Sequence, residues 1–492
     1  MKNKFIHIIT AAVFTLSLLT ACGNTDTEEE PLVTIQRTEP TSRTSYTLPE
    51  TETESPSVAV TEIYTENDGE TSVGTAVISV PGIMTEKHHA EVSEIITEGE
   101  ENVTVSARNL LSSDGGSNIS EVPADTQTAS VEAVYSGKYY ALNYPTQKGM
   151  WFSYLEYDRI MKGQSRDEFT RLTEEAFDNM VSIGINTVYI HLRPFGDAYY
   201  NSSFFPKGDR LTGGYDPLEI MVKAAHDRGL SVHGWINPMR LMTDSGMKSL
   251  SSTYLIKQWY DSGKNMYEYD GRWYLDPSSE EVRKLICDGV IEILSGYDVD
   301  GIQIDDYFYP TADLSWDMKS YENSGKILSH EDFRRNAVTQ MVKDMYSAVH
   351  RENSSAVFGI SPSGNAEANY KTLYADVELW CKSSDCCDYI CPQIYYGIEH
   401  QSYPFERTLE QWQNMCSDTV TVVAGIAAYK AGQSDSYAGS GINEWVNNSN
   451  VVAREMTIAK EHNCGIALFR YDSLFETKGA AEKELEEIKK LS

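Results

Sequence analysis

The sequence predicts an α/β fold, a (β/α)8 TIM barrel preceded by a disordered linker, and three observations support this prediction. From about residue 136 to the end, short apolar segments alternate with helical segments eight times. Such alternation is typical of a parallel sheet that is covered by helices. This region spans roughly 350 residues, a length that α/β barrels commonly reach as one domain. The first apolar segment is not followed by the glycine-rich phosphate loop of doubly wound open sheets.

Eight strands are expected where runs of aliphatic, aromatic and β-branched residues lie between turn residues. In chain order they are 150–154, 187–193, 231–237, 301–305, 357–361, 389–395, 421–426 and 465–469. Helices are expected between them at about 165–183, 216–229, 276–294, 331–350, 374–381, 405–416 and 445–462, and a last helix of acidic and basic residues closes the chain.

Three of these helices carry a signal for their first turn. Ser165 and Glu168 have the spacing of a capping box. The pairs Asp216-Pro217 and Asp276-Pro277 each place a capping residue before a proline in the first turn. We therefore expect the three helices to begin at these residues.

The start of the chain is typical of a secretory signal, because lysines precede a short apolar run from Phe5 to Leu19. That run is shorter than the roughly 20 residues of a membrane span. The following residues, Leu19-Thr20-Ala21-Cys22, resemble the lipobox of bacterial lipoproteins. The resemblance implies that residues 1–21 are removed and that Cys22 is lipidated, which would anchor an extracytoplasmic protein to the bacterial cell membrane through lipid alone. An ordinary signal peptide with a chance cysteine is the alternative.

The formal net charge of −32 argues against binding to nucleic-acid phosphates. Much of this charge lies in the predicted linker, residues 22–135, where 22 acidic residues stand against 4 basic ones. The linker is rich in threonine, serine, glutamate and proline and has few aromatic residues, so it cannot bury enough apolar surface to offset the entropy of ordering. We expect it to be a disordered spacer before the barrel of residues 136–492.

Seven cysteines follow Cys22, and four of them lie close together, Cys381, Cys386, Cys387 and Cys391. Their spacing does not match a standard zinc pattern. Buried thiols are the main expectation, with a local disulfide or a zinc site as alternatives.

The carboxyl ends of the strands are where a barrel of this kind carries its functional site. These ends hold carboxylates, arginines, amides and aromatic rings, a mixture that suits sugars. The candidate substrate-binding residues are Arg193, Asp197, Trp235, Asn237, Arg240, Tyr307, Gln393 and Tyr395. The candidate catalytic carboxylates are Asp305, Asp306 and Glu156.

The alternation of side chains along a strand separates these residues by face. Asp305 shares a face with Gln303 and Tyr307, and Arg193 shares a face with His191 in the second strand. Because such polar faces cannot lie in the dry layer under the helices, we expect them to line the lumen. Asp305 is therefore the better lumen-facing carboxylate, and Asp306 turns inward only if the strand has ended.

Structural roles for the same residues stay open. Asp305 and Arg193 could form an internal ion pair, and His191 and His233 could be satisfied core histidines. The two histidines could also meet Asp305 at a metal ion. The prediction is a site without metal or cofactor.

Several motifs, in order along the chain, resemble the bacterial family-10 glycosyl-hydrolase-like barrels. They are RPFGD at 193–197, YDPL at 215–218, AH at 225–226, WINP at 235–238, DVDGIQIDDYFYP at 298–310, GISP at 359–362 and PQIY at 392–395, within about 148–474. The resemblance implies a surface enzyme that cleaves glycosidic bonds in a polysaccharide, and some members are associated with the glycan strands of peptidoglycan. Ser363 stands where the family has a bulkier residue, so substrate preference can differ.

Glycoside cleavage commonly uses two carboxyl groups, about 5–5.5 Å apart for retention and about 6.5–9.5 Å apart for inversion. Asp305 is the first candidate for the nucleophile or base, and Glu156, just after the first strand, for the proton donor. The alternatives for the donor are Asp197, Asp306, Asp376, Glu399 and Asp472. The sequence leaves retention and inversion open. It also leaves open a non-catalytic glycan-binding barrel and a metal-dependent carbohydrate hydrolase or deacetylase.

Overall fold

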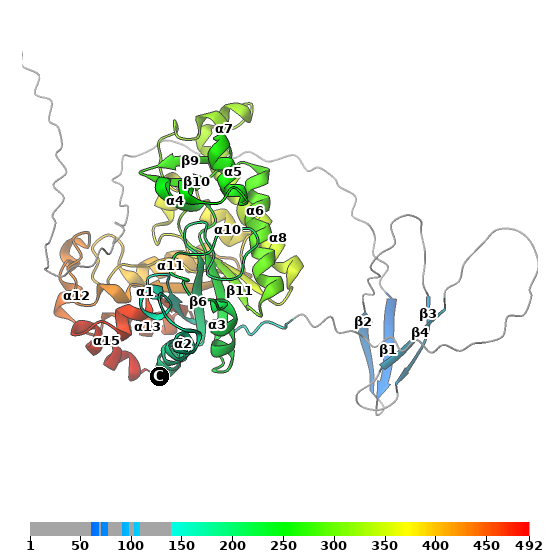
Figure 1. The fold of residues 1–492 in the computed structure, drawn as a ribbon. Helices are drawn as coiled ribbons and strands as arrows, with labels where there is room; N and C mark the ends of the chain where they lie inside the picture. Colours follow the sequence, from blue (N-terminus) through cyan, green and yellow to red (C-terminus); the bar gives the residue numbers. More distant parts are fainter. Residues whose placement is uncertain (1–60, 68–69, 77–90, 98–102, 109–138, 492) are drawn as a thin grey trace, which may run out of the picture. The chain divides into compact units, whose positions relative to one another are not determined.

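The computed structural model describes residues 61–67, 70–76, 91–97, 103–108 and 139–491 (Figure 1). The chain divides into two compact units, Met1–His89 and Ala90–Ser492. The predicted signal peptide, Cys22 and most of the predicted linker lie outside the described residues.

Two antiparallel hairpins lie in the segment that was predicted to be a linker. In the first unit, β1 (Thr61–Asn67) pairs with β2 (Glu70–Ala76). In the second unit, β3 (Glu91–Thr97) pairs with β4 (Val103–Arg108). A disordered spacer without strands was expected here. Each of the four strands contains at least three β-branched residues, which favour extended backbone, a signal that the acidic composition masks.

The second unit also contains the barrel, and its closure confirms the predicted fold class. Parallel strands close in the order β11-β12-β13-β14-β15-β5-β6-β7. They are β5 (Lys148–Phe152), β6 (Thr187–Arg193), β7 (Ser231–Ile236), β11 (Gly301–Ile304), β12 (Val357–Ile360), β13 (Tyr389–Ile390), β14 (Thr421–Ile426) and β15 (Gly465–Leu468). The sixth strand is shorter than predicted because Pro392 has no N–H to continue the ladder, and only isolated bridges follow at Gln393.

Helices follow the strands and surround the barrel (Figure 1). The main ones are α2 (Arg166–Ser182), α3 (Pro217–His226), α6 (Glu280–Gly296), α8 (His330–Glu352), α10 (Val377–Lys382), α11 (Phe405–Met415), α13 (Val451–Glu461) and α15 (Ala480–Lys489). The caps predicted at Ser165 and Asp216 are confirmed, since both side chains accept a backbone hydrogen bond. The cap predicted at Asp276 is wrong, because its carboxylate bonds to Ser278 and α6 begins later, after Ser279.

A long excursion follows β7 and forms a separate three-stranded sheet in the order β8-β10-β9. Its strands are β8 (Arg240–Thr243), β9 (Met266–Tyr269) and β10 (Arg272–Leu275), and α4 (Asp244–Ser249) and α5 (Leu255–Ser262) accompany them. Helix α7 (Met318–Asn323) lies in the loop after β11. Figure 1 shows this group at one end of the barrel. Because β8 follows the carboxyl end of β7, this end is the mouth of the barrel.

The inward faces of the strands fill the lumen, as their alternation predicted. Trp151, Tyr189, Trp235 and Tyr389 belong to one buried cluster there. Trp151 Nε1 donates to Gln303 Oε1 over 2.7 Å, and Gln303 Nε2 donates to the Tyr389 hydroxyl over 3.2 Å. The lumen is therefore a packed core with a hydrogen-bonded centre, and it is not a channel.

The chain segment that enters the barrel covers its amino end, opposite the mouth. Asp300, just before β11, accepts hydrogen bonds from the Tyr139 hydroxyl over 2.8 Å and from the backbone N–H of Leu142. The side chain of Asn143 reaches His233 over 3.1 Å. The described chain thus enters the barrel at the end away from the mouth. Among the described helices, none has the length and apolar character that crossing a membrane requires.

Candidate active site

Two adjacent carboxylates follow strand β11 at the mouth. The strand ends at Ile304, after which Asp305 is buried and Asp306 is partly exposed. Trp235 Nε1 donates to Asp305 Oδ2 over 3.1 Å, and the backbone N–H of Tyr307 donates to Asp305 Oδ1 over 3.3 Å. Asp305 therefore lies where the alternation of the strand predicted.

The surroundings of this acid pair, Asp305 and Asp306, favour one retained proton. Burial and then the charge of Asp306 raise the pKa of Asp305 well above its usual range, while Tyr307, Arg240 and Trp235 act in the opposite direction. Burial also raises the pKa of Asp306, against a hydrogen bond from Gln393 and the charge of Arg240. Since two neighbouring carboxyls do not ionise together easily, these surroundings favour the protonated form of Asp305.

The indole of Trp235 is held from two sides. His191 stacks on it with the ring centroids 3.5 Å apart and the planes 13° apart. Its Nε1 also donates to Asn237 Oδ1 over 3.2 Å, and Asn237 Nδ2 donates to the carbonyl of Pro194 over 3.2 Å. Burial, with a contribution from the charge of Arg240, holds the pKa of His191 well below its usual range. The neutral ring of His191 and the amide of Asn237 thus fix the position of Trp235, and its Nε1 donates to Asp305.

Arg240, the first residue of β8, brings a positive charge to the acid pair. Its guanidinium lies 4.0 Å from the centre of the Tyr307 ring and 4.8 Å from that of Phe195. The side chain is almost completely buried. The structure therefore brings Trp235, Arg240 and Tyr307 together as predicted, and it adds Phe195, which the sequence analysis did not single out.

The opposite side of the mouth comes from the segments after β13, β14 and β15. Burial raises the pKa of Tyr395, and the charges of Tyr429, Cys391, Asp306 and Asp305 add to the shift. Its ring centroid lies 5.9 Å from Tyr429 and 5.8 Å from Phe469. Neither Tyr429 nor Phe469 was among the predicted site residues. Phe469 directly follows a strand and could have been found by that rule, whereas Tyr429 lies in a short 3-10 turn that has no pattern of its own.

Arg193 does not face the lumen, contrary to the prediction from strand alternation, and the alternative of an ion pair with Asp305 is not found. The guanidinium lies 3.8 Å from the centre of the Phe205 ring, in the layer outside the barrel. A side chain at Gly289 on helix α6 would collide with it. The register between β6 and β7 shifts between His191 and Arg193. Such an irregularity changes which side of the sheet a residue faces, so Arg193 points toward the helices.

Glu156 lies in a different network from the acid pair. Its Oε2 accepts from the backbone N–H of Ser153 over 2.8 Å, and its Oε1 accepts from Arg470 over 2.7 Å and from the N–H of Asp472 over 3.2 Å. Burial raises its pKa to about 6, and the charge of Arg470 opposes the shift. Glu156 thus ties the end of β5 to the segment after β15. Asp305 is not among these partners, so the described contacts do not favour Glu156 as the proton donor.

Asp197 stabilises the turn after β6. Its carboxylate accepts from the backbone N–H of Phe195 over 2.8 Å, across Gly196, whose φ of +67° favours glycine. Burial raises the pKa of Asp197 to about 6. Asp197 therefore contributes to the mouth indirectly, by holding Phe195 in position.

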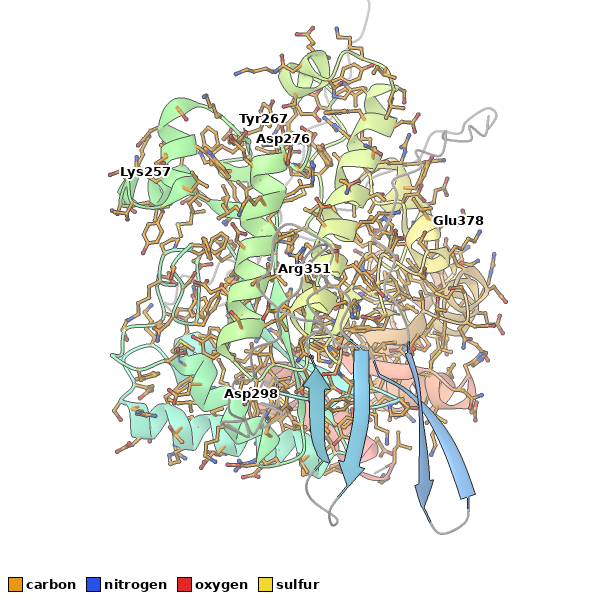
Figure 2. All side chains as sticks on the ribbon, turned by 90° about the vertical axis from the view of Figure 1, so that its right-hand side faces the viewer. Lys257, Tyr267, Asp276, Asp298, Arg351 and Glu378 are labelled. Carbon is orange, nitrogen blue, oxygen red and sulfur yellow. The ribbon has the colours of Figure 1, made fainter. Side chains whose placement is uncertain are left out.

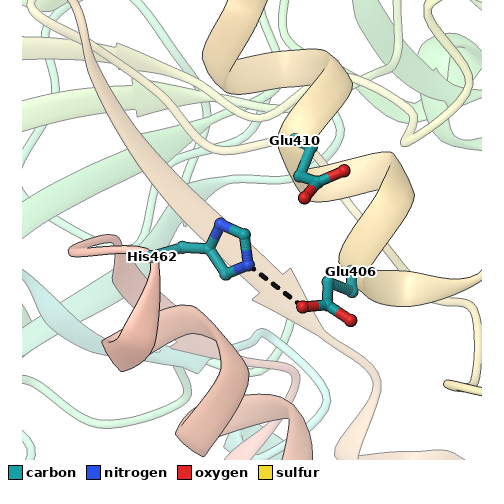
Figure 3. Close-up of side chains that lie close together, drawn as sticks. All are labelled: Glu406, Glu410 and His462. Atoms are coloured by element: carbon teal, nitrogen blue, oxygen red, sulfur yellow. Dashed lines mark hydrogen bonds and ion pairs between the residues drawn. The ribbon is translucent and has the colours of Figure 1, made fainter.

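The metal alternative placed His191, His233 and Asp305 at one ion, but these side chains have other partners. His191 stacks on Trp235, and His233 Nδ1 lies 2.8 Å from the Tyr389 hydroxyl. Over residues 139–491, the potential metal ligands that converge in a group of three are Glu406, Glu410 and His462. Figure 3 shows Glu406 and Glu410 on one helix, α11, and His462 in the turn that follows α13. This group supplies no ligand at the strand ends.

Comparison with known proteins places this barrel in a family. Residues 149–439 match the family described as "Glycosyl hydrolase-like 10". The chain is 30% identical over 328 residues to "Glycosyl hydrolase YngK" of Bacillus subtilis (strain 168), covering 61% of each chain. It is 33% identical over 291 residues to "Glycosyl hydrolase DigH" of Escherichia coli (strain K12), covering 53% of this chain and 66% of the relative. The match thus spans less than two thirds of either relative's length.

Among solved structures, the glycoside hydrolase domain of PgaB (BpsB) from Bordetella bronchiseptica is similar over 70% of this chain and 99% of that one. The TM-score is 0.48 and the sequence identity is 12%, which is too low to support an argument about function. The family match instead covers the strands and loops that carry the acid pair. The chain belongs to the glycosyl hydrolase-like 10 family.

Proposed function

We propose that this protein hydrolyses glycosidic bonds in a polysaccharide through the acid pair, and that peptidoglycan glycan strands are the first substrate to test. The observation that carries the proposal is the pair itself. Asp305 is buried, hydrogen-bonded by Trp235 and next to a second carboxyl, and its raised pKa favours the protonated form. A proton donor beside an ionised carboxylate is what acid-assisted glycoside cleavage needs.

In the proposed reaction, Asp305 gives its proton to the oxygen of the leaving sugar while the bond from that oxygen to the anomeric carbon breaks. Asp306 stays ionised, supported by Gln393 and Arg240. It faces the positive charge that develops on the sugar and acts as the nucleophile or as the base for water. This assignment reverses the expectation of Asp305 as nucleophile or base, because the retained proton favours the role of acid.

The substrate and the location are supported by the sequence. The resemblance to barrels that are associated with peptidoglycan supports the substrate, and the Leu19–Cys22 motif supports a lipid anchor on the outer side of the bacterial cell membrane. The described chain enters the barrel at Tyr139, beside Asp300 at the amino end. A tether at that end would leave the mouth free to meet a polymer.

The test is hydrolysis of purified peptidoglycan glycan strands freed of peptide, with Asp305→Asn and Asp306→Asn compared with the wild type. Each substitution keeps the shape of the side chain and removes its acid–base function. We expect each to lower turnover by about 100- to 10,000-fold, the usual contribution of a general acid or base. The matched control is Asp298→Asn, an exposed position at the other end of the barrel (Figure 2), which should keep full activity.

Thermal unfolding of the same samples separates loss of chemistry from loss of fold. Folded Asp305→Asn or Asp306→Asn protein with turnover within tenfold of the wild type would contradict the assignment. Binding of the strands without any product would favour a glycan-binding barrel. Loss of wild-type activity with a chelator would favour metal-dependent chemistry.

A further inference from the structure

We propose that the small sheet β8-β10-β9 is a binding wall that holds a polymeric glycan several sugars away from the bond that is cleaved. The inference rests on the proposed function and names the substrate class of the same site, a long chain and not a short oligosaccharide. The sheet is an insertion between β7 and α6 and adds no strand to the barrel. Figure 1 shows it at the mouth, with α4, α5 and α7 nearby.

The strand register divides the side chains of this sheet between two faces. Trp273 and Leu275 of β10 lie on one face, where Leu275 pairs with Met266. Leu275 and Met266 are buried, and Trp273 packs against Tyr260 of helix α5 with ring centroids 5.1 Å apart. This face therefore belongs to the core of the insertion.

The other face, which we call the wall, carries rings and guanidinium groups. Tyr274 pairs with Arg240 on one side and with Tyr267 on the other, and these three side chains form the row next to the barrel. Arg272 pairs with Tyr269 in the outer row. Side chains directly opposite each other on neighbouring strands share one face, so the wall consists of three tyrosines and two arginines, of which Arg240 is almost completely buried at its inner edge.

The wall is continuous with the acid pair. Arg240 lies 4.0 Å from the ring of Tyr307, which follows the acid pair in the chain. At the outer row, the Arg272 guanidinium lies 4.3 Å from the ring of Phe195, which Arg240 also contacts. A ligand leaving the mouth along these rings would therefore meet the wall directly.

The loop after β11 adds a tryptophan to the same surface. The ring of Trp316 lies 5.1 Å from that of Tyr267 and 6.4 Å from that of Tyr274. Its Nε1 donates to the carbonyl of Glu268 over 2.8 Å, which fixes the loop against β9. Trp316 is partly exposed, and Tyr269 in the outer row is 40% exposed. Figure 2 shows Tyr267 toward the mouth end of the barrel, far from Asp298.

This composition favours a sugar chain as the occupant. Pyranose rings offer flat C–H faces that pack on aromatic rings, and their hydroxyls accept hydrogen bonds from guanidinium groups. Neighbouring strands lie about 4.8 Å apart, so the three strands span about 10 Å, which is wider than a single sugar ring. A disaccharide at the acid pair would leave the outer row empty, whereas a long strand would cover it.

The test compares hydrolysis of long and short peptide-free peptidoglycan glycan strands, the short fraction being tetrasaccharides. The variants are Tyr269→Ala and the double variant Tyr269→Ala/Tyr274→Ala. The control is Tyr140→Ala, an 85% exposed tyrosine at the amino end of the barrel. We expect the KM for long strands to rise about tenfold in the double variant, since aromatic contacts of about 1.4 kcal/mol correspond to that factor. The kcat, and the turnover of tetrasaccharides, should not change.

Equal effects on long and short strands, or no effect on either, would overturn the wall while leaving the proposed function intact. If the wild type cleaves no strand of any length, the proposed substrate fails. In that case the affinity for long strands is compared between the Asp305→Asn protein and the Asp305→Asn/Tyr269→Ala protein, which tests the wall without any cleavage. A weaker affinity caused by Tyr269→Ala supports it, and an unchanged affinity or no binding at all refutes it.

Discussion

The hydrogen bond from Trp235 to Asp305 provides a sensitive test of which carboxyl is the acid. Trp235→Phe removes the Nε1 donor and keeps an aromatic ring that can stack on His191. In the wild type this donor stabilises the ionised form of Asp305 and so lowers its pKa. Its removal should therefore raise the pKa of Asp305. If Asp305 is the acid, the alkaline limb of the pH profile of kcat/KM moves to higher pH.

The size of the shift follows from the geometry. A hydrogen bond to a charged group contributes about 1.5–3 kcal/mol, and each pKa unit corresponds to about 1.36 kcal/mol. The indole N–H is shared between Asp305 Oδ2 at 3.1 Å and Asn237 Oδ1 at 3.2 Å, so the lower part of this range applies. We expect a shift of about one pH unit, measured as initial rates on glycan strands across the pH range.

The matched control is Trp151→Phe. Trp151 also donates its indole N–H in the lumen, but its acceptor is the neutral amide of Gln303 at 2.7 Å. This change should lower stability without moving the alkaline limb. An alkaline limb that stays in place in Trp235→Phe, or moves to lower pH, would refute Asp305 as the acid. A shift of the acidic limb instead would support Asp305 as the base.

Three further predictions concern stability and location. Burial, with the charges of Glu444 and Glu484, raises the pKa of Glu455 well above its usual range, so the folded state keeps a proton that the unfolded state loses above about pH 4.5. The free energy of unfolding should therefore fall by up to about 1.4 kcal/mol per pH unit above that value. Glu455→Gln should remove this slope in urea unfolding, and a stability difference between the variant and the wild type that does not depend on pH would contradict the prediction. A chain that starts at residue 136 should unfold like the full chain. A chain that starts at residue 148 lacks the Tyr139 hydroxyl and the Leu142 N–H that donate to Asp300, and its free energy of unfolding should be lower by at least about 3 kcal/mol. Equal denaturation midpoints of the two shortened chains would show that residues 136–147 add no stability. Cys22→Ser should release the protein from membranes or block its processing, and unchanged membrane association in fractionated cells would exclude the anchor.

Much of the barrel and part of its mouth could be predicted from the sequence. The alternation of β11 put Gln303 and Asp305 on one face, and the structure has both in the lumen or at its mouth. The rule that function follows the strand ends led to Trp235, Arg240 and Tyr395, which surround the acid pair. It failed for Glu156, because a strand end says nothing about which partner the carboxylate will find. That partner, Arg470, lies 314 positions away in the chain.

The sequence by itself determined the order of strands and helices, the closed barrel and the carboxylates after β11, because these follow from local backbone preference and from the period of apolar residues. Only the tertiary structure decided which polar groups meet. A single register shift in β6 turns Arg193 outward, and the excursion after β7 returns Arg240 to the mouth and builds the wall beside it. Such contacts depend on how loops from distant strands converge once the barrel closes. The period of a single strand does not contain that information.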